Sequence, residues 1–352
     1  MEYLTVNTTL LLSQESLQNN FSPITNYSEF RSSAEIEIEV FLAAMCGFLA
    51  AVGNGLLIIA IRTQPYLRQR NINRLMESLA WTDVITAFIV IPSFCVSLAK
   101  GEWVFGETFC NVKAFLLALT TFATLDTLTV IALSRLLQVV FNKTYRKILG
   151  SPKKTDIAIG LVWLVSTISA GAPIIGWGAY AYLPCFYVCT LEWHPRNRDY
   201  LVFVNILSTY PATVFIIACY ICISVYYRKK RRRVLFSCNT KSKGTRVVRS
   251  HLAEVRVMRM TGAVVVFYLI CWFPIAVMLN LKQYGVPVSR RAPVLSPFLK
   301  FVNSCGNPIF YVIMDGRIRK TFLRIVRLNR CATEEVQQLN INTRAHVKMV
   351  TV

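Results

Sequence analysis

The chain has 352 residues, of which 54% are apolar and only 16% are charged, well below the roughly 25% that is usual in a soluble domain. This balance excludes an ordinary soluble protein and indicates a membrane protein. The net charge is +21, but the basic residues lie between long apolar runs, so nucleic-acid binding is not expected. The three histidines are far apart, and no set of residues has the spacing of metal ligands.

The first 36 residues form a polar tail that carries three N-glycosylation acceptor sequences, at Asn7, Asn20 and Asn26. Three such sequences in one short tail outside the apolar runs indicate an extracellular, glycosylated amino terminus. No cleavable signal sequence precedes them, so we expect the first membrane span to be an uncleaved anchor.

Seven apolar runs follow, and each is about long enough to cross a bilayer as a helix. They cover residues 37–62, 73–98, 109–139, 156–177, 200–227, 256–281 and 293–315. Basic residues concentrate in alternate connections and after the last run, which places the amino terminus outside and the carboxyl terminus in the cytoplasm. The sequence therefore predicts an all-α, multi-pass protein of the plasma membrane, with a seven-transmembrane helix bundle over 37–315.

The segment 316–328 is amphipathic, because its apolar residues fall on one helical face and its arginines on the other. We expect a short cytoplasmic helix on the membrane surface, within a unit that extends over 316–330. Cys331, just beyond it, is a candidate for palmitoylation, and a plain free thiol is the alternative. The tail 331–352 is polar and is expected to be disordered.

Polar residues at membrane depth are costly and mark functional sites. Asp83 lies in the middle of the second run, and other runs carry amides and hydroxyls at a similar depth. These are Asn54, Thr124, Asn303, Ser304 and Asn307. One carboxylate among hydroxyls and amides suits a sodium ion or a network of water, and hydrogen-bonded contact between helices is the simpler alternative. Asp126 lies about 200° round the helix from Thr124, so we expect a structural hydrogen bond toward the fourth or fifth run.

Prolines interrupt five of the seven runs. They are Pro92, Pro173, Pro211, Pro274 and Pro308. Kinked helices open a cavity and provide hinges. Trp272 precedes one of these prolines by two residues, and we interpret its large, rigid indole as a moving part beneath that cavity.

Charged and sulfur-containing residues mark both ends of the third run. Cys110 begins it, and Cys185 and Cys189 lie in the loop after the fourth run, so a disulfide across the cavity mouth is expected on the oxidising side. At the inner end, Arg135 and Glu254 are expected either to pair between the third and sixth helices or to remain two solvated charges of little energetic weight.

Taken in order, these motifs resemble the rhodopsin-like (class A) G-protein-coupled receptors over about 37–330, and opsins and melatonin receptors are the most similar members. The residues that carry the resemblance are Asn54, Leu79-Ala80-x-x-Asp83, Cys110, Arg135, Trp163, Pro211, Cys271-Trp272-Phe273-Pro274 and Asn307-Pro308-x-x-Tyr311. Each motif is weak alone, but the ordered set is very specific.

The resemblance implies roles for several of these residues. Cys110 would pair with Cys189, and the group around Asp83 would form the sodium-and-water site of the family. Trp272 would be the toggle residue under the ligand, with Pro274 as a hinge.

At the inner end, the resemblance implies that Arg135 and Glu254 form the ionic lock of the resting state and that Tyr311 swings inward on activation. The family's Asp/Glu-Arg-Tyr motif is Ser134-Arg135-Leu136 here, so the restraint of the arginine would depend more on Glu254. The tyrosine of the fifth span is also displaced: Cys219 holds its place and Tyr220 follows.

The candidate ligand pocket contains Lys113, Leu117, Trp272 and Lys300. An amine ligand is disfavoured, because Leu117 replaces the aspartate of amine receptors. Retinal is disfavoured, because the opsin lysine position is Phe301, Lys300 is turned about 100° from it, and Lys113 replaces the counter-ion. The two lysines are expected to meet an anionic ligand such as a carboxylate or lipid acid, unless Lys300 snorkels or pairs with another span.

The expected function is that of a receptor that converts binding of an extracellular ligand into activation of heterotrimeric G proteins, through rearrangement of the third, sixth and seventh helices. Arrestin, receptor kinases and the lipid bilayer are further implied partners. No cofactor is expected apart from an allosteric sodium ion. The alternatives are an opsin-like photoreceptor that uses Lys300, and a transporter or ion pathway built on Asp83, although we find no internal repeat typical of transporters. The sequence shows no nucleophile–base pair of the kind that would indicate an enzyme.

Overall fold

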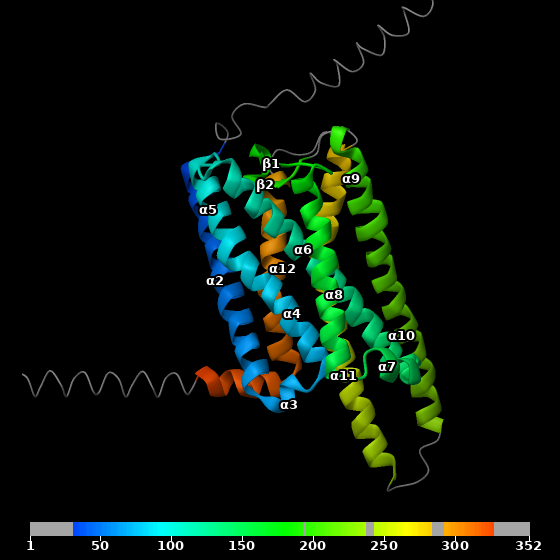
Figure 1. Ribbon diagram of the computed structural model, residues 1–352. Coiled ribbons are helices and arrows are strands. Elements are labelled where there is room, and N and C mark those ends of the chain that lie inside the picture. The colour runs from blue at the N-terminus through cyan, green and yellow to red at the C-terminus, as the bar shows by residue number, and fades with distance from the viewer. Residues whose placement is uncertain (1–30, 193–194, 237–242, 284–291, 327–352) are drawn as a thin grey trace, which may run out of the picture.

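The computed structural model describes residues 31–192, 195–236, 243–283 and 292–326. Within these ranges, seven long helical segments stand side by side as a bundle (Figure 1). Their bounds are α2 Ser33–Thr63; α4 Asn71–Ile85 with η2 Thr86–Val90 and α5 Ile91–Lys100; α6 Gly106–Val140; α8 Pro152–Gly171 with η3 Ala172–Ile175; α9 Arg198–Val202 with η6 Phe203–Thr209 and α10 Tyr210–Phe236; α11 Lys243–Gln283; and α12 Ala292–Met314. The predicted seven-helix bundle is confirmed. The predictions for Asn7, Asn20, Asn26 and Cys331 lie outside the described residues.

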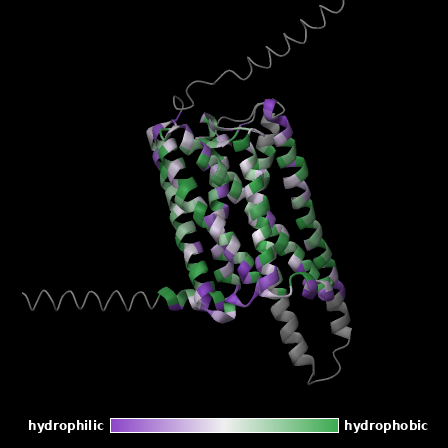
Figure 2. Ribbon diagram, viewed as in Figure 1, coloured by the Kyte–Doolittle hydropathy of each residue, from purple (hydrophilic) through white to green (hydrophobic). Residues whose placement is uncertain are grey.

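The outer surface of the bundle is apolar, as a lipid solvent requires. Phe88, Phe273 and Ile313 are each more than 60% exposed, yet they lie on transmembrane helices. Figure 2 shows hydrophobic residues along the length of the bundle and hydrophilic residues gathered toward its ends. Six of the described helical segments are long and apolar enough to cross a membrane. The seventh, α12, carries Lys300 and the polar group near Asn307, and it packs between α2 and α11.

The expected proline interruptions change the local helix type at three places. A π-helical turn, η2, lies just before Pro92, and a second, η6, lies just before Pro211. Pro173 lies within the 3₁₀ turn η3. Proline lacks a backbone N–H and its ring displaces the preceding turn, so the local hydrogen-bond spacing changes there. Pro274 and Pro308 lie inside the continuous helices α11 and α12.

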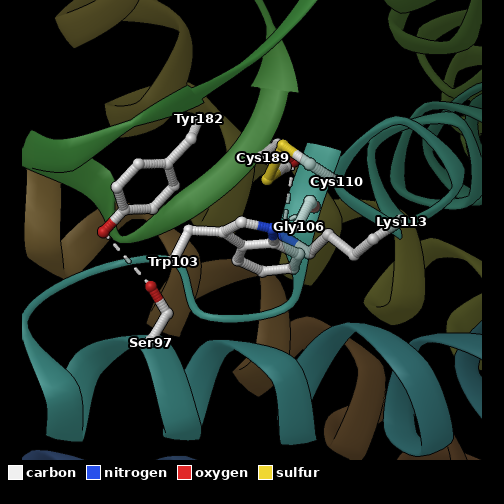
Figure 3. Close-up of a disulfide and its surroundings, with 7 residues drawn as sticks. All are labelled: Ser97, Trp103, Gly106, Cys110, Lys113, Tyr182 and Cys189. Atoms are coloured by element: carbon white, nitrogen blue, oxygen red, sulfur yellow. Dashed lines mark hydrogen bonds between the residues drawn. A yellow bond between two sulfur atoms is a disulfide. The ribbon is translucent and has the colours of Figure 1, made fainter. Parts of the chain in front are cut away.

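One end of the bundle is covered by an antiparallel hairpin of β1 (Tyr180–Leu183) and β2 (Val188–Leu191). A disulfide joins Cys110 of α6 to Cys189 of β2, so the resemblance identified the correct partner. Figure 3 shows further contacts nearby: Ser97 donates to the Tyr182 hydroxyl at 3.2 Å, and Trp103 Nε1 donates to a backbone carbonyl at 2.7 Å. The hairpin is therefore fixed to two helices.

The opposite end is tied together by short helices. Residues 316–326 are helical and lie across the bundle (Figure 1), as expected for the amphipathic segment. Asp315 accepts from the Arg317 backbone N–H at 2.9 Å and pairs with Arg70 at 3.1 Å. The Tyr66 hydroxyl, on α3 (Pro65–Arg68), lies 2.8 Å from that of Thr321. A further short helix, α7 (Asn142–Ile148), follows α6.

The close approach of α11 and α12 gives a first test. A Cβ atom on Gly306 would overlap the ring of Phe267. We expect Gly306→Ala to lower the free energy of unfolding by about 1–3 kcal/mol, because the ring of Phe267, packed between the helices, must shift to admit the methyl group. Gly55→Ala is the matched control, since no atom lies within 4 Å of the added carbon. The melting temperature of the purified protein measures both, and equal values for the two variants would contradict this assignment.

Candidate functional site

A cavity of about 240 Å³ lies beneath the hairpin, between α6, α11 and α12 and the turn η6. All four residues predicted for the ligand pocket line it: Lys113, Leu117, Trp272 and Lys300. Most of the other lining side chains are apolar or aromatic, and none of the described lining residues is an aspartate or glutamate. The cavity therefore has a mostly apolar lining, and the charged groups among its described residues are two lysines.

Lys300 reaches from α12 to the facing helix α6. Its Nζ donates to the Thr121 hydroxyl at 2.7 Å and to the Leu117 carbonyl at 3.2 Å. The same nitrogen lies 5.7 Å from the ring centroid of Trp272, in the geometry of a cation–π contact. Lys300 was expected to meet an anionic ligand, to snorkel or to pair with another span. In the structure it contacts another span, α6.

Lys113 lies at the hairpin end of the same cavity and is completely buried. Its Nζ donates to the backbone carbonyl of Cys189 at 3.3 Å, next to the disulfide (Figure 3). The disulfide holds β2 against α6 and so brings this acceptor to the lysine. An ammonium group has three N–H donors, and this single long hydrogen bond leaves it poorly satisfied.

The polar residues predicted at membrane depth meet below the cavity. Asn307 Nδ2 donates to the Asp83 carboxylate at 3.0 Å, and Asn54 Nδ2 donates to the Ser304 carbonyl at 3.0 Å. The Thr124 hydroxyl instead lies 3.0 Å from that of Thr82, the residue before Asp83. These contacts join α2, α4, α6 and α12.

Two amide oxygens in this region have no hydrogen-bond partner among the described residues. They are Oδ1 of Asn54 and Oδ1 of Asn303, and both are buried. Like the Asp83 carboxylate, they are hard oxygen donors, and their chemistry is of the kind that ordered water or a sodium ion takes.

Asp126 belongs to a separate contact, as its position on the helix predicted. The Ser166 hydroxyl of α8 donates to its carboxylate at 3.2 Å. On the same helix, Trp163 Nε1 donates to the Ser78 hydroxyl at 3.0 Å. These two hydrogen bonds fasten α8 to α6 and α4, which is a structural role.

At the end opposite the hairpin, Arg135 is 7% exposed and has a partner that sequence reasoning missed. Its guanidinium donates to the Gln138 side-chain carbonyl at 2.7 Å. The signal was present, because residues three apart on a helix are neighbours. The side chain of Glu254, the expected lock partner, lies outside the described residues.

Two tyrosines complete this inner region. Tyr311 is buried in the core shared by α2, α4, α6 and α11. Cys219 is also buried, and the adjacent Tyr220 places its ring 3.5 Å from the position that a Cβ on Gly262 of α11 would take. The displaced tyrosine of the fifth span therefore still faces α11.

Comparison with known proteins agrees with this geometry. A family model described as 7 transmembrane receptor (rhodopsin family) matches residues 53–311. Melatonin receptor type 1B of Mus musculus is 31% identical over 280 residues, which are 78% of this chain and 74% of that protein. The visual pigment-like receptor peropsin of Homo sapiens is 25% identical, over 86% of this chain and 88% of that protein.

A solved structure shows the same fold. The crystal structure of squid rhodopsin superimposes with a TM-score of 0.72 at 22% identity, and it covers 88% of this chain and 91% of that chain. This likeness shows the fold, and the family match over 53–311 shows the family. The chain therefore belongs to the rhodopsin family of seven-transmembrane receptors, and it is a G-protein-coupled receptor, not an enzyme.

Proposed function

We propose that this receptor is activated by a small extracellular ligand that occupies the cavity under the hairpin and acts on Trp272. The observation that carries this proposal is that one cavity brings Lys113, Leu117, Trp272 and Lys300 together in a mostly apolar space. Such a space, with a few polar groups, is the usual form of a ligand site.

Trp272 is a suitable first element of the response. Its indole Nε1 is buried and has no acceptor among the described residues. An unsatisfied buried donor costs about 1–3 kcal/mol, so a rearrangement that supplies an acceptor is favourable. Pro274, one half-turn later on α11, gives that helix a point at which to bend.

The signal then passes through the polar contacts to the inner end. Movement of α11 against α12 would disturb the contacts of α12, including the Asp83–Asn307 hydrogen bond to α4, and free Tyr311. Arg135 would then exchange Gln138, its neighbour on α6, for new partners. A cytoplasmic cleft would then open to the G protein. A ligand drives this change only through its higher affinity for the active arrangement.

The finer setting follows from charge and sequence. The positive-inside rule supports an extracellular amino terminus and a cytoplasmic carboxyl terminus in the plasma membrane. Receptor kinases and arrestin are proposed as further cytoplasmic partners, and Asn7, Asn20 and Asn26 as glycosylation sites. Asp83, Asn54 and Asn303 would hold a sodium ion, which supplies positive charge next to the buried carboxylate.

The cavity is tested by filling it. A small-molecule library is screened with cAMP and calcium readouts against the wild type and Leu117→Trp, whose indole would occupy the cavity. We expect compounds that activate the wild type to lose at least tenfold in potency on Leu117→Trp. Val112→Trp is the control, because Val112 is on the same helix but is 47% exposed. Equal potency on all three proteins would contradict the proposed site.

The restraint on Arg135 is tested by basal signalling. Gln138→Ala removes its hydrogen bond, and we expect basal signalling to rise about fivefold, the factor that ~1 kcal/mol produces in an equilibrium. Gln138→Glu should keep basal signalling at or below the wild-type level, because a carboxylate binds the guanidinium more strongly. Glu254→Ala tests the predicted lock in the same assay. Unchanged basal signalling for either alanine variant, at equal surface expression, would remove that residue from the resting restraint.

Sodium binding is tested by melting temperature. We expect replacement of NaCl by N-methyl-D-glucamine chloride to lower the melting temperature of the wild type by about 2–4 °C, as loss of a native-state ligand does. Asp83→Asn should abolish this difference, because it removes the charge that holds the cation. Asp126→Asn should retain it, since that carboxylate contacts Ser166 elsewhere in the bundle. A difference that survives in Asp83→Asn would reject the site.

A further inference from the structure

We propose that the ligand of this cavity is an elongated amphiphilic carboxylate whose anionic group binds Lys113 and whose apolar body extends along α6 toward Trp272. This inference rests on the proposed ligand cavity and names the chemical class that the cavity takes.

The first step is the unequal state of the two lysines. Lys300 already has acceptors on α6 from Leu117 and Thr121, and the ring of Trp272 beside it. Lys113 is also buried, but among the described residues its one acceptor is the Cys189 carbonyl, at 3.3 Å. Lys113 is therefore the less satisfied of the two ammonium groups.

The second step is the distribution of charge. Asp83 attracts Lys300 electrostatically from below. Among the described residues, the cavity lining holds one other charged group, Lys300, which has the same sign as Lys113 and repels it. Since burying an ion without a countercharge is unfavourable, a ligand anion at Lys113 would recover a penalty that the described part of the protein leaves uncompensated.

The third step is the shape of the lining along α6. Lys113, Leu117, Thr121 and Leu125 line the cavity at intervals of four residues, so they follow one face of the helix. The ring of Trp272 lies near the level of Thr121, because both are close to Lys300 Nζ, and Thr121 is eight residues, or about 12 Å, along the helix from Lys113. A ligand that joins Lys113 to Trp272 must therefore be elongated.

The fourth step is the chemistry of the remaining lining. Below Lys113 it is largely aromatic and aliphatic, with Phe94, Phe122 and Ile275 among its members. None of the described lining residues is an arginine, the side chain whose planar fork suits phosphate. One ammonium as a point charge above an apolar channel suits a monoanionic carboxylate.

The experiment measures the melting temperature of the purified receptor with oleic acid and with methyl oleate at equal concentrations. The ester keeps the apolar body but lacks the negative charge. We expect oleic acid to raise the melting temperature at a concentration at least tenfold lower than methyl oleate does. This preference should disappear in Lys113→Met and persist in Lys113→Arg and in Lys100→Met, which changes an exposed lysine that does not line the cavity.

The variants also separate this inference from the proposed cavity. If both compounds stabilise the wild type equally and Leu117→Trp abolishes both effects, the cavity stands and the carboxylate is overturned. If oleic acid retains its advantage in Leu117→Trp or in Lys113→Met, it binds elsewhere, and the carboxylate inference fails.

Two other ligand chemistries are outcomes of the same test. Oleoyl lysophosphatidic acid that acts at a tenfold lower concentration than oleic acid, with the effect lost in Lys113→Met, would replace carboxylate by phosphate. Incubation with retinal that gives a visible absorbance band, lost in Lys300→Ala, would overturn the inference in favour of a covalent chromophore.

Discussion

The hydrogen bond from Asn307 to the Asp83 carboxylate, buried and 3.0 Å long, fixes the position of α12 along the bundle. At membrane depth no bulk water can replace either partner, so a shift of α12 by one residue would strand both groups. The resulting register of α12 also determines where Lys300 lies. Lys300 lies seven residues earlier, about 10 Å nearer the hairpin and on nearly the same helical face, where α6 supplies its acceptors. One polar contact thus positions the lysine above Trp272.

The two cavity lysines have different partners and therefore different roles. Lys300 joins α12 to α6, so its charge helps to define the resting arrangement of the helices. Lys113 depends on the hairpin, because its acceptor is a carbonyl of the residue that the disulfide fixes, Cys189. The covering hairpin is therefore an electrostatic component of the cavity as well as its lid. An apolar cavity with two ammonium groups selects ligands by charge before it selects them by shape.

Much of the fold was predictable, because apolar runs of membrane length and motifs in fixed order leave few alternative arrangements. The site was predictable by residue type but less so by partner. Lys300 finds its acceptors on a helix about 180 positions away, which only packing reveals. The Arg135–Gln138 contact was not predicted, because Arg135 lacks the family's neighbouring acid and Glu254 was the expected partner, although a neighbour at i+3 is within reach. Thr124 has the expected depth, but depth does not specify a face, and its hydroxyl meets Thr82.

The length of α11 has a mechanical consequence. The helix is continuous from Lys243 to Gln283, and Pro274 lies near its hairpin end. The 31 residue steps from Lys243 to Pro274 form an arm of about 46 Å. A bend of about 10° at the proline would carry the far tip through roughly 8 Å, while the ring of Trp272, beside the pivot, would travel only a fraction of that distance. The helix therefore works as an amplifier: a displacement small enough to be produced by one ligand becomes large enough to admit a protein.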